Sequence, residues 1–445
     1  MRIAWFTHRY FPIIGGAENY GRAIVRRFVD DGHHVDVFTS DARDLWYFTD
    51  RSRPRLDGPE TIDVDGANVR RFRVRHWFGQ RYAGRLLSYL PRWSTQCRYE
   101  SFMPIIPGLD RVHGKYDAVF GVGFPYTIFS HAAWKTAKRS GTPLILTPFL
   151  HLATPGDKVN RAYTRPHQAR LLRESDCVVV QTNLEADAVA EWGVERSRIL
   201  VLGMAVDHGA VTGGAKFSLR DRLAIPRHRR TVGHLATLDP NKGSTDLVKA
   251  ITKLNETRGN EPIGLILAGP SSPEFETFAA DLPKDVARWL TRLGPLALED
   301  RAEFFAAIDV FAMPSRTDSY GIVFLEAWAN GLPVVAAEAG GVSEVIRHNL
   351  DGLLVPFGDI SKLSEAIGGL IDDPNAARTL GTQGRDRIAS GYSWDDRYKT
   401  LLDRSLGAIS GQTRADHGHQ SPGSRPLPTG RVRNQAKEAV QDHRD

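Results

Sequence analysis

The chain has 445 residues, of which 41% are hydrophobic and 25% are charged, as in ordinary folded proteins. This composition excludes a collagen-like or largely disordered protein, and the length favours two domains over a single core. The two cysteines, Cys97 and Cys177, have no CxxC spacing, so neither a disulfide framework nor a thiolate metal site is indicated. The net charge of +6 leaves nucleic acid, a membrane surface and an anionic substrate open as partners.

The apolar run at residues 3–6 is too short for the core of a signal peptide. No apolar stretch reaches the length of about 18 residues that a membrane-spanning helix needs. We therefore expect a cytoplasmic protein.

Short β-rich runs alternate with helical patterns along the first half of the chain, which is typical of βαβ units. The predicted strands there are 2–7, 34–39, 117–121, 143–147, 177–181 and 198–202, and the first predicted helix is 17–30. A second series comprises predicted strands 231–236, 263–268, 308–312 and 333–337 and predicted helices 244–255, 299–306 and 322–330. The pattern predicts an α/β protein with two Rossmann-like, doubly wound domains.

The expected boundaries follow from these two series. We predict a first domain over 1–205, a second over 206–390 and a helix over 391–410 that crosses back to the first domain. Residues 203–226 have several glycines and no clear periodicity, so they are predicted to be a linker. Residues 411–445 contain one leucine and no aromatic residue, and this composition predicts a disordered tail.

Glycines at the start of the first helix are the first candidate ligand-binding feature. Gly15 and Gly16 follow a predicted strand and open an amphipathic helix. Backbone amides there can approach a ligand, and the positive end of the helix dipole favours an anion. Taken alone, the pair is better explained by a tight strand-to-helix turn, so this feature needs support from elsewhere in the chain.

Charged residues follow two strands of the second series. Lys242 stands just before a predicted helix, where it can neutralise a diphosphate, although such a lysine is often only solvated. Asp318 precedes the helix that contains Glu326, so the two carboxylates can grip different parts of one ligand. The apolar neighbours of Glu326 predict a buried carboxylate that needs a partner, such as a hydroxyl-bearing ligand; the alternative is a residue on the helix surface.

Four segments, taken in order, resemble the retaining glycosyltransferases of family 4, which have the GT-B fold. They are Gly15–Glu18, Leu238–Gly243, Asp318–Glu326 continuing to Val335, and Gly340–Ile346. The resemblance spans about residues 1–408 and implies two Rossmann-like domains that face a central cleft.

The resemblance implies a role for each matching residue. The Gly16 amide, Lys242 and the amides of residues 319–322 would hold the donor diphosphate, Glu326 the ribose hydroxyls and Asp318 the transferred sugar. His151 would lie near that sugar, unless it is a structural histidine, and the base would lie near Leu293. The implied catalytic residues are Asp318, His151 and Lys242, and the implied donor-binding residues are Gly15, Gly16, Thr237, Lys242, Leu293, Ser319, Tyr320, Gly321, Ile322 and Glu326.

Two positions depart from the family pattern. Thr237 stands where an arginine usually pairs with the lysine on the diphosphate, and a hydroxyl cannot replace that clamp. Either another cation such as Arg316 or His234 reaches the phosphates, or the donor binds weakly, or turnover is lost. Asp318 stands where glutamate is commoner, which shortens the reach of the carboxylate.

The activity that the resemblance implies is metal-independent transfer of a hexosyl group, with retention, from a UDP- or GDP-sugar to a hydroxyl acceptor. The expected context is glycolipid or cell-envelope polysaccharide synthesis, with no cofactor besides the nucleotide sugar. The alternative is a non-catalytic nucleotide-sugar-binding protein of the same fold, which Thr237 favours. A nucleic-acid-binding protein and a dehydrogenase are disfavoured, because no recognition motif and no GxGxxG is found.

Positive charge is concentrated in one segment. Residues 70–98 contain eight arginines and no acidic residue, so the rest of the chain carries 6 − 8 = −2. Aromatic residues and leucines alternate with these arginines, as in a basic amphipathic element. We expect residues 70–98 either to dock on an anionic membrane at its inner face or to bind a lipid-linked or phosphorylated acceptor. The alternative is a solvated arginine-rich helix.

Overall fold

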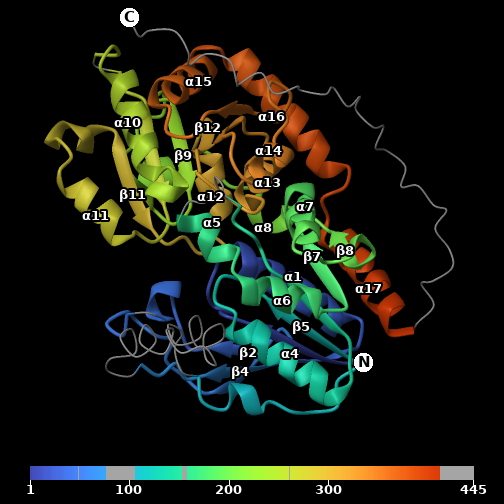
Figure 1. The fold of residues 1–445 in the computed structure, drawn as a ribbon. Coiled ribbons are helices and arrows are strands. Elements are labelled where there is room, and N and C mark those ends of the chain that lie inside the picture. Colours follow the sequence, from blue (N-terminus) through green and yellow to red (C-terminus); the bar gives the residue numbers. More distant parts are fainter. Residues whose placement is uncertain (49, 77–105, 153–157, 260, 411–445) are drawn as a thin grey trace, which may run out of the picture.

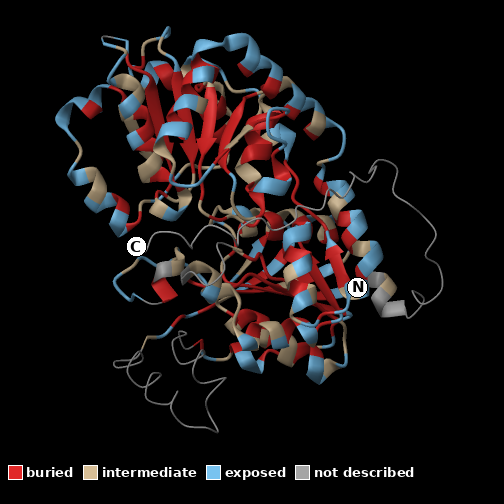
Figure 2. Ribbon diagram, turned by 45° about the horizontal axis from the view of Figure 1, so that its top comes forward, coloured by how far each residue is buried: buried red, intermediate tan, exposed pale blue. Residues whose placement is uncertain are grey.

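The computed structural model describes residues 1–48, 50–76, 106–152, 158–259 and 261–410 (Figure 1). These residues form two α/β domains, one on an eight-stranded sheet and one on a six-stranded sheet, with helices covering both faces of each (Figure 1). Both sheets form the buried centre of their domain (Figure 2). The GT-B architecture expected from the sequence is confirmed.

The first sheet has the order β3(Thr61–Val64), β4(Ala67–Phe72), β2(His34–Ser40), β1(Arg2–Thr7), β5(Ala118–Val122), β6(Leu144–Thr147), β7(Cys177–Val180) and β8(Ile199–Val201). Within the described residues its neighbouring strands pair in parallel, except for the antiparallel hairpin of β3 and β4. Apart from Arg2, every residue of β1 is buried. Such continuous apolar strands are expected where helices cover both faces of a sheet.

The helices of the first domain are α1(Gly16–Asp30), α4(Ile128–Ser140), α5(Lys158–Tyr163), α6(Pro166–Arg173) and α7(Asn183–Glu191). Short 3₁₀ turns lie at η1(Leu45–Phe48), η2(Leu109–Arg111) and η3(Arg196–Arg198). Ile24, Val25 and Phe28 lie on the buried face of α1 and join Trp5 of β1 in one core. The apolar spacing of this helix therefore fixes where its glycine-rich start lies above the sheet.

The second sheet has the order β11(Leu290–Gly294), β10(Gly264–Ala268), β9(Thr231–Leu235), β12(Val310–Met313), β13(Val334–Ala337) and β14(Leu353–Val355). Its pairs are parallel, so the carboxyl ends of β9 and β12 lie side by side. The helices are α10(Ser244–Asn255), α11(Pro273–Ala280), α12(Arg301–Ala306), α13(Ile322–Ala329), α14(Val342–Val345), α15(Ile360–Asp372) and α16(Pro374–Ala389), with η4(Pro240–Lys242) and η5(Lys284–Arg288). Ligands of open parallel sheets bind at such carboxyl ends.

The segment between the sheets is more ordered than the plain linker that we expected at 203–226. It contains α8(His208–Val211) and α9(Ser218–Arg222). Arg220 is buried, donates to the Ala307 carbonyl over 2.7 Å and pairs with Asp309 at 2.9 Å. This ion pair fastens the segment to the second sheet, because Asp309 immediately precedes β12. The prediction missed these helices because each is too short to show a period.

The last helix, α17(Trp394–Ser410), returns to the first domain (Figure 1). Asp395 accepts a hydrogen bond of 2.6 Å from Arg27 of α1, and the Tyr398 hydroxyl donates to Asp31 over 2.7 Å. Both contacts join α17 to the end of α1, so α17 connects the second domain back to the first.

The arginine-rich segment is described only in part. Arg70 and Arg71 belong to β4, and Arg71 donates to the Phe11 carbonyl over 3.2 Å. Residues 77–98, on which most of the membrane hypothesis depends, lie outside the described residues, as does the tail 411–445. No helix of the described ranges combines the length and apolarity needed to cross a bilayer.

Burial of histidines predicts acid-sensitive stability. Burial lowers the pKa of His234 to about 4, so in the folded chain it stays neutral down to that pH, whereas in the unfolded chain it binds a proton near pH 6.5. The stabilisation is complete above about pH 6.5 and decreases by about 1.4 kcal/mol per pH unit towards pH 4. Urea unfolding at pH 7, 6 and 5 should therefore give a shallower pH dependence for His234→Asn than for the unmodified chain. Identical slopes would contradict a buried neutral His234.

Candidate active site

The starts of two helices from different domains face each other. Gly15 is the extended N-cap of α1, with φ −169°, and Gly16 is the first residue of that helix. A Cβ added to Gly16 would lie 3.9 Å from Cγ2 of Ile322, the first residue of α13. The positive ends of two helix dipoles therefore meet at the domain junction, which favours an anionic group between them.

Gly321 makes the turn into α13. Its φ is +82°, and a Cβ there would lie 2.6 Å from the Phe324 ring, so a side chain would be strained and would clash. The loop from β12 can thus present its amides, including those of Ser319 and Tyr320, at the start of α13.

Lys242 and Asp318 form an ion pair at this junction. Lys242 Nζ lies 2.6 Å from Asp318 Oδ2, and 24% and 16% of the two side chains are exposed. The residues come from loops after β9 and β12, whose carboxyl ends are adjacent. Burial acts to raise the pKa of Asp318, but the Lys242 ammonium outweighs it and the pKa is lowered. This ion pair therefore supplies a cation and a carboxylate that are both partly accessible.

His151 of the first domain lies beside this ion pair. It follows β6 and hydrogen-bonds to the Thr317 backbone, next to Asp318. Its ring lies 5.0 Å from that of Tyr163, centre to centre. Burial, reinforced by the nearby Lys242, lowers the pKa of His151 to about 4, so the imidazole is neutral at physiological pH. The structure thus brings together His151, Lys242 and Asp318.

Glu326 lies in the second turn of α13 and is buried, as its apolar neighbours predicted. One of its oxygens, Oε1, accepts from Nη1 of Arg301, at the start of α12. The other, Oε2, has no hydrogen-bond partner among the described residues. Burial raises the pKa of Glu326, and the Arg301 charge opposes this rise. The partner that the sequence analysis expected for this buried carboxylate is thus in part Arg301, and one oxygen is left for a ligand.

The remaining sequence candidates are spread around this centre. Thr237 lies partly exposed after β9, whereas Leu293 lies in β11 at the edge of the sheet, two strands from β9. The Ser319 hydroxyl donates a hydrogen bond to Glu185 of the first domain. Tyr320 packs beside Gly203, where an added Cβ would lie 3.4 Å from the tyrosine hydroxyl. All four residues belong to the second domain, and Ser319 and Tyr320 contact the first domain across the junction.

Of the two substitute cations proposed for the missing arginine, His234 is ruled out. It is fully buried, with Nδ1 2.9 Å from the Ala312 carbonyl and Nε2 2.9 Å from the Ser244 hydroxyl. Its pKa of about 4 leaves it neutral, so it cannot supply charge to a phosphate. Arg316 lies on the Asp318 loop, with its guanidinium 6.0 Å from the centre of the Phe357 ring.

Two carboxylates at the junction were missed by the sequence analysis. Glu344 of the second domain accepts from the amides of Asn183 and Leu184 at the start of α7, over 2.8 and 2.5 Å. Glu185 of α7 is buried, which raises its pKa to about 8, and it accepts from Ser319. The pattern Thr182-x-x-Glu185 is a capping-box signal, but sequence spacing does not reveal partners from another domain.

Replacing Glu344 by alanine should loosen the junction. The variant removes the acceptor of two helix-start amides, an interaction worth about 1–2 kcal/mol. Hydrogen exchange at Asn183 and Leu184 should then accelerate about tenfold. Glu338→Ala, which changes an exposed glutamate on the neighbouring loop, is the matched control and should leave this exchange unchanged. Equal protection in both variants would show that Glu344 does not hold the two domains together.

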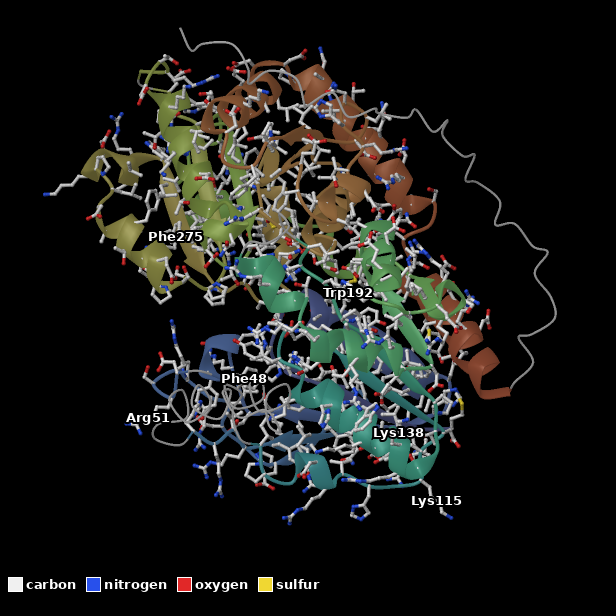
Figure 3. The ribbon with its side chains drawn as sticks, in the orientation of Figure 1. Phe48, Arg51, Lys115, Lys138, Trp192 and Phe275 are labelled. Atoms are coloured by element: carbon white, nitrogen blue, oxygen red, sulfur yellow. The ribbon has the colours of Figure 1, made fainter. Side chains whose placement is uncertain are left out.

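Cations at the other end of the first domain are not part of this site. Lys115 and Lys138 project from the end of that domain away from the second domain (Figure 3). A hollow lined by residues including Trp134, Lys138 and Glu174 opens at the same end. The candidate active site is thus confined to the domain junction.

Two doubly wound domains whose helix starts face each other across a charged junction form the GT-B architecture. Solved structures share this fold: sucrose-phosphate synthase from Thermosynechococcus elongatus has a TM-score of 0.72 at 20% identity, covering 92% of this chain and 100% of that one. Anabaena HepE in complex with UDP-glucose has a TM-score of 0.65 at 18% identity, covering 92% and 100%.

Sequence comparison identifies the family. The model described as "Glycosyl transferase 4-like domain" matches residues 15–205, and the model described as "Glycosyl transferases group 1" matches residues 229–373. The chain belongs to these group 1, or family 4, glycosyltransferases.

Two similar proteins are named for an enzymatic activity. The chain is 28% identical over 431 residues to a D-inositol 3-phosphate glycosyltransferase of Stackebrandtia nassauensis, covering 92% of this chain and 90% of that protein. It is 32% identical over 208 residues to a GDP-mannose-dependent alpha-(1-6)-phosphatidylinositol monomannoside mannosyltransferase of Mycobacterium tuberculosis. This match covers 45% of this chain and 53% of that protein. The chain is thus a glycosyltransferase that uses a nucleotide sugar.

Proposed function

We propose that the chain is a retaining hexosyltransferase that uses a UDP- or GDP-sugar as donor and a hydroxyl group as acceptor. The observation that carries this proposal is the Lys242–Asp318 ion pair, which lies beside His151 at the junction where the starts of α1 and α13 meet. This site offers one cation and two sets of backbone amides to a diphosphate.

The chemistry follows from charge. As the bond to the anomeric carbon breaks, negative charge develops on the departing diphosphate, and Lys242 with the helix-start amides stabilises it. A diphosphate would compete for the ammonium group of Lys242, leaving Asp318 to accept hydrogen bonds from sugar hydroxyls. His151 is neutral, so it can accept or donate a hydrogen bond at the sugar without adding charge.

Retention does not require a protein nucleophile in this proposal. A donor phosphate oxygen takes the proton of the acceptor hydroxyl on the face from which the diphosphate leaves, and the new bond forms on that same face. The pair of carboxylates used by retaining hydrolases is then unnecessary. Lys242 supplies the positive charge, so the proposed step runs without a metal ion.

The proposed acceptor is a phosphorylated or lipid-linked polyol. Relatives over the whole chain are named for D-inositol 3-phosphate, and a relative over part of it for a phosphatidylinositol mannoside. The basic residues 70–98 belong to the first domain, which is the acceptor side in the proposed arrangement.

Residues 70–98 are further proposed to dock on an anionic membrane surface at the cytoplasmic face. Each arginine near such a surface contributes about 1 kcal/mol. The full chain should therefore float with vesicles containing phosphatidylserine at low salt but not with neutral vesicles, and should be released at high salt. Failure to float at low salt would exclude membrane docking and leave acceptor binding or a solvated arginine-rich segment.

A non-catalytic nucleotide-sugar-binding protein is the second candidate function, because Thr237 stands where the family has a phosphate-binding arginine. A saturation-transfer NMR screen against UDP- and GDP-sugars, followed by incubation with inositol phosphates, separates the two. An enzyme should bind one donor and release its nucleoside diphosphate when the acceptor is present. Binding without turnover with any acceptor would favour the second function, and no binding at all would refute both.

A further inference from the structure

A buried ion pair joins the two helices that flank the end of β12. Arg301 opens α12, Glu326 lies in α13, and their side chains are only 7% and 3% exposed. Such a pair loses the hydration of two charges and rarely stabilises a fold more than apolar packing would. Its presence at this position therefore calls for another explanation.

Each member of the pair has one polar atom without a partner. Among the described residues, neither Nε of Arg301 nor Oε2 of Glu326 has a hydrogen-bond partner, although both atoms are buried. More than nine in ten buried polar groups in proteins are paired. A free donor and a free acceptor on one ion pair match a ligand with hydroxyl groups, since each hydroxyl can both donate and accept.

We propose that Arg301 is a positioning residue. It fixes the Glu326 carboxylate so that Oε2 accepts hydrogen bonds from the ribose hydroxyls of the donor nucleotide. The inference rests on the proposed function, because it needs a nucleotide in the site. Arg301 acts in two ways: its planar fork fixes the orientation of the carboxylate, and its charge opposes the rise in the pKa of Glu326 that burial causes.

The backbone around Arg301 is well suited to hold this orientation. Glu303, two residues further along α12, accepts from the Ser218 hydroxyl over 2.9 Å and pairs with Arg222 at 2.6 Å, so α9 holds α12. A Cβ on Gly214 would lie 2.1 Å from the Ala302 carbonyl oxygen, which shows how closely the connecting segment packs there. The segment that we expected to be a plain linker thus fixes the start of α12.

The helix that carries Glu326, α13, is anchored as well. Asn330, at the end of α13, donates to the Val211 carbonyl of α8 and to the Glu326 carbonyl, both over 2.9 Å. Both helices of the pair are therefore anchored to the same connecting segment. A positioning role needs this rigidity, because a carboxylate misplaced by about 1 Å loses much of its effect on a bound ligand.

Binding measurements with nucleotides that lack the ribose hydroxyls test this role. The full chain, Arg301→Lys and Arg301→Gln are titrated calorimetrically with UDP, GDP and their 2′,3′-dideoxy analogues. The lysine variant keeps the charge and so guards against misfolding, while losing the planar fork. Arg258→Gln removes an arginine of the same domain from its surface pair with Asp372, which lies outside α12 and α13, and serves as the matched control.

The unmodified chain and the Arg258→Gln control should bind the natural nucleotide at least about tenfold more tightly than its dideoxy analogue. In both Arg301 variants this preference should fall below about threefold, with affinity for the dideoxy analogue unchanged. An equal loss of affinity for both nucleotides, or an undiminished preference, would overturn the positioning role alone. If the unmodified chain binds no nucleotide, the proposed function fails, and this inference with it.

Discussion

Lys242→Ala is expected to lower kcat for sugar transfer by about 10²–10³-fold, the usual loss when one group that stabilises developing negative charge is removed. Lys242 is the cation of the described site that lies closest to Asp318, at 2.6 Å, and it approaches from the loop after β9. Removing it also leaves Asp318 without its ion-pair partner. The loss should appear in both kcat and kcat/KM, measured by release of nucleoside diphosphate.

The control for this prediction is Lys284→Ala. Lys284 is exposed in η5 of the same domain. The substitution therefore removes the same charge from the protein without changing the junction. Its kinetics should match those of the unmodified enzyme. If Lys242→Ala keeps more than about a third of the activity, Lys242 is not the cation for the diphosphate.

Glu326→Ala should abolish most turnover and also destabilise the fold. The ribose hydroxyls would lose their acceptor, and Arg301 would be left as an uncompensated buried charge, which costs about 3–5 kcal/mol. Titration with the donor measures the lost affinity for the ribose, and urea unfolding measures the lost stability.

Glu303→Ala is the matched variant for stability. Glu303 pairs with Arg222 at the surface, where 30% and 58% of the side chains are exposed, so its removal should cost less than about 1 kcal/mol. A Glu326→Ala protein as stable as this control would contradict the buried ion pair, and one with normal turnover would contradict the ribose site.

Ten of the fourteen strands in the described residues could be predicted from sequence to within about two residues, because parallel strands covered on both faces are continuous apolar runs. The edge strands β11 and β14 were missed: β11 is only partly buried and β14 has three residues. The hairpin of β3 and β4 was missed, since its strands alternate polar and apolar residues and include Arg70 and Arg71. The helices α8 and α9 were missed because four or five residues are too few to show a period.

The candidate site could be predicted only where local chemistry is visible in the sequence. Glycines at helix starts and a lysine after a strand carry their own physical signal, and the apolar neighbours of Glu326 indicated its burial. The partner Arg301 could not be inferred, because a pairing across 25 positions depends on how two helices pack. The contact of Glu344 with Asn183 spans 161 positions and two domains, so it required the folded chain.

Burial also corrected one hypothesis that charge alone had suggested. His234 is a basic side chain at the end of a strand in the right domain, which made it a candidate for the missing phosphate-binding cation. The structure gives both ring nitrogens protein partners and no exposure, so its role is in the core. The roles of the other site residues remain predictions, and Thr237 stands where the resemblance leads us to expect an arginine.

A crystal structure of the chain with the nucleoside diphosphate that it binds most tightly tests the central claim most directly. We expect the diphosphate to lie between Lys242 and the starts of α1 and α13, with the ribose at Glu326. A nucleotide bound elsewhere, or one at the junction with its phosphates turned away from Lys242, would contradict it.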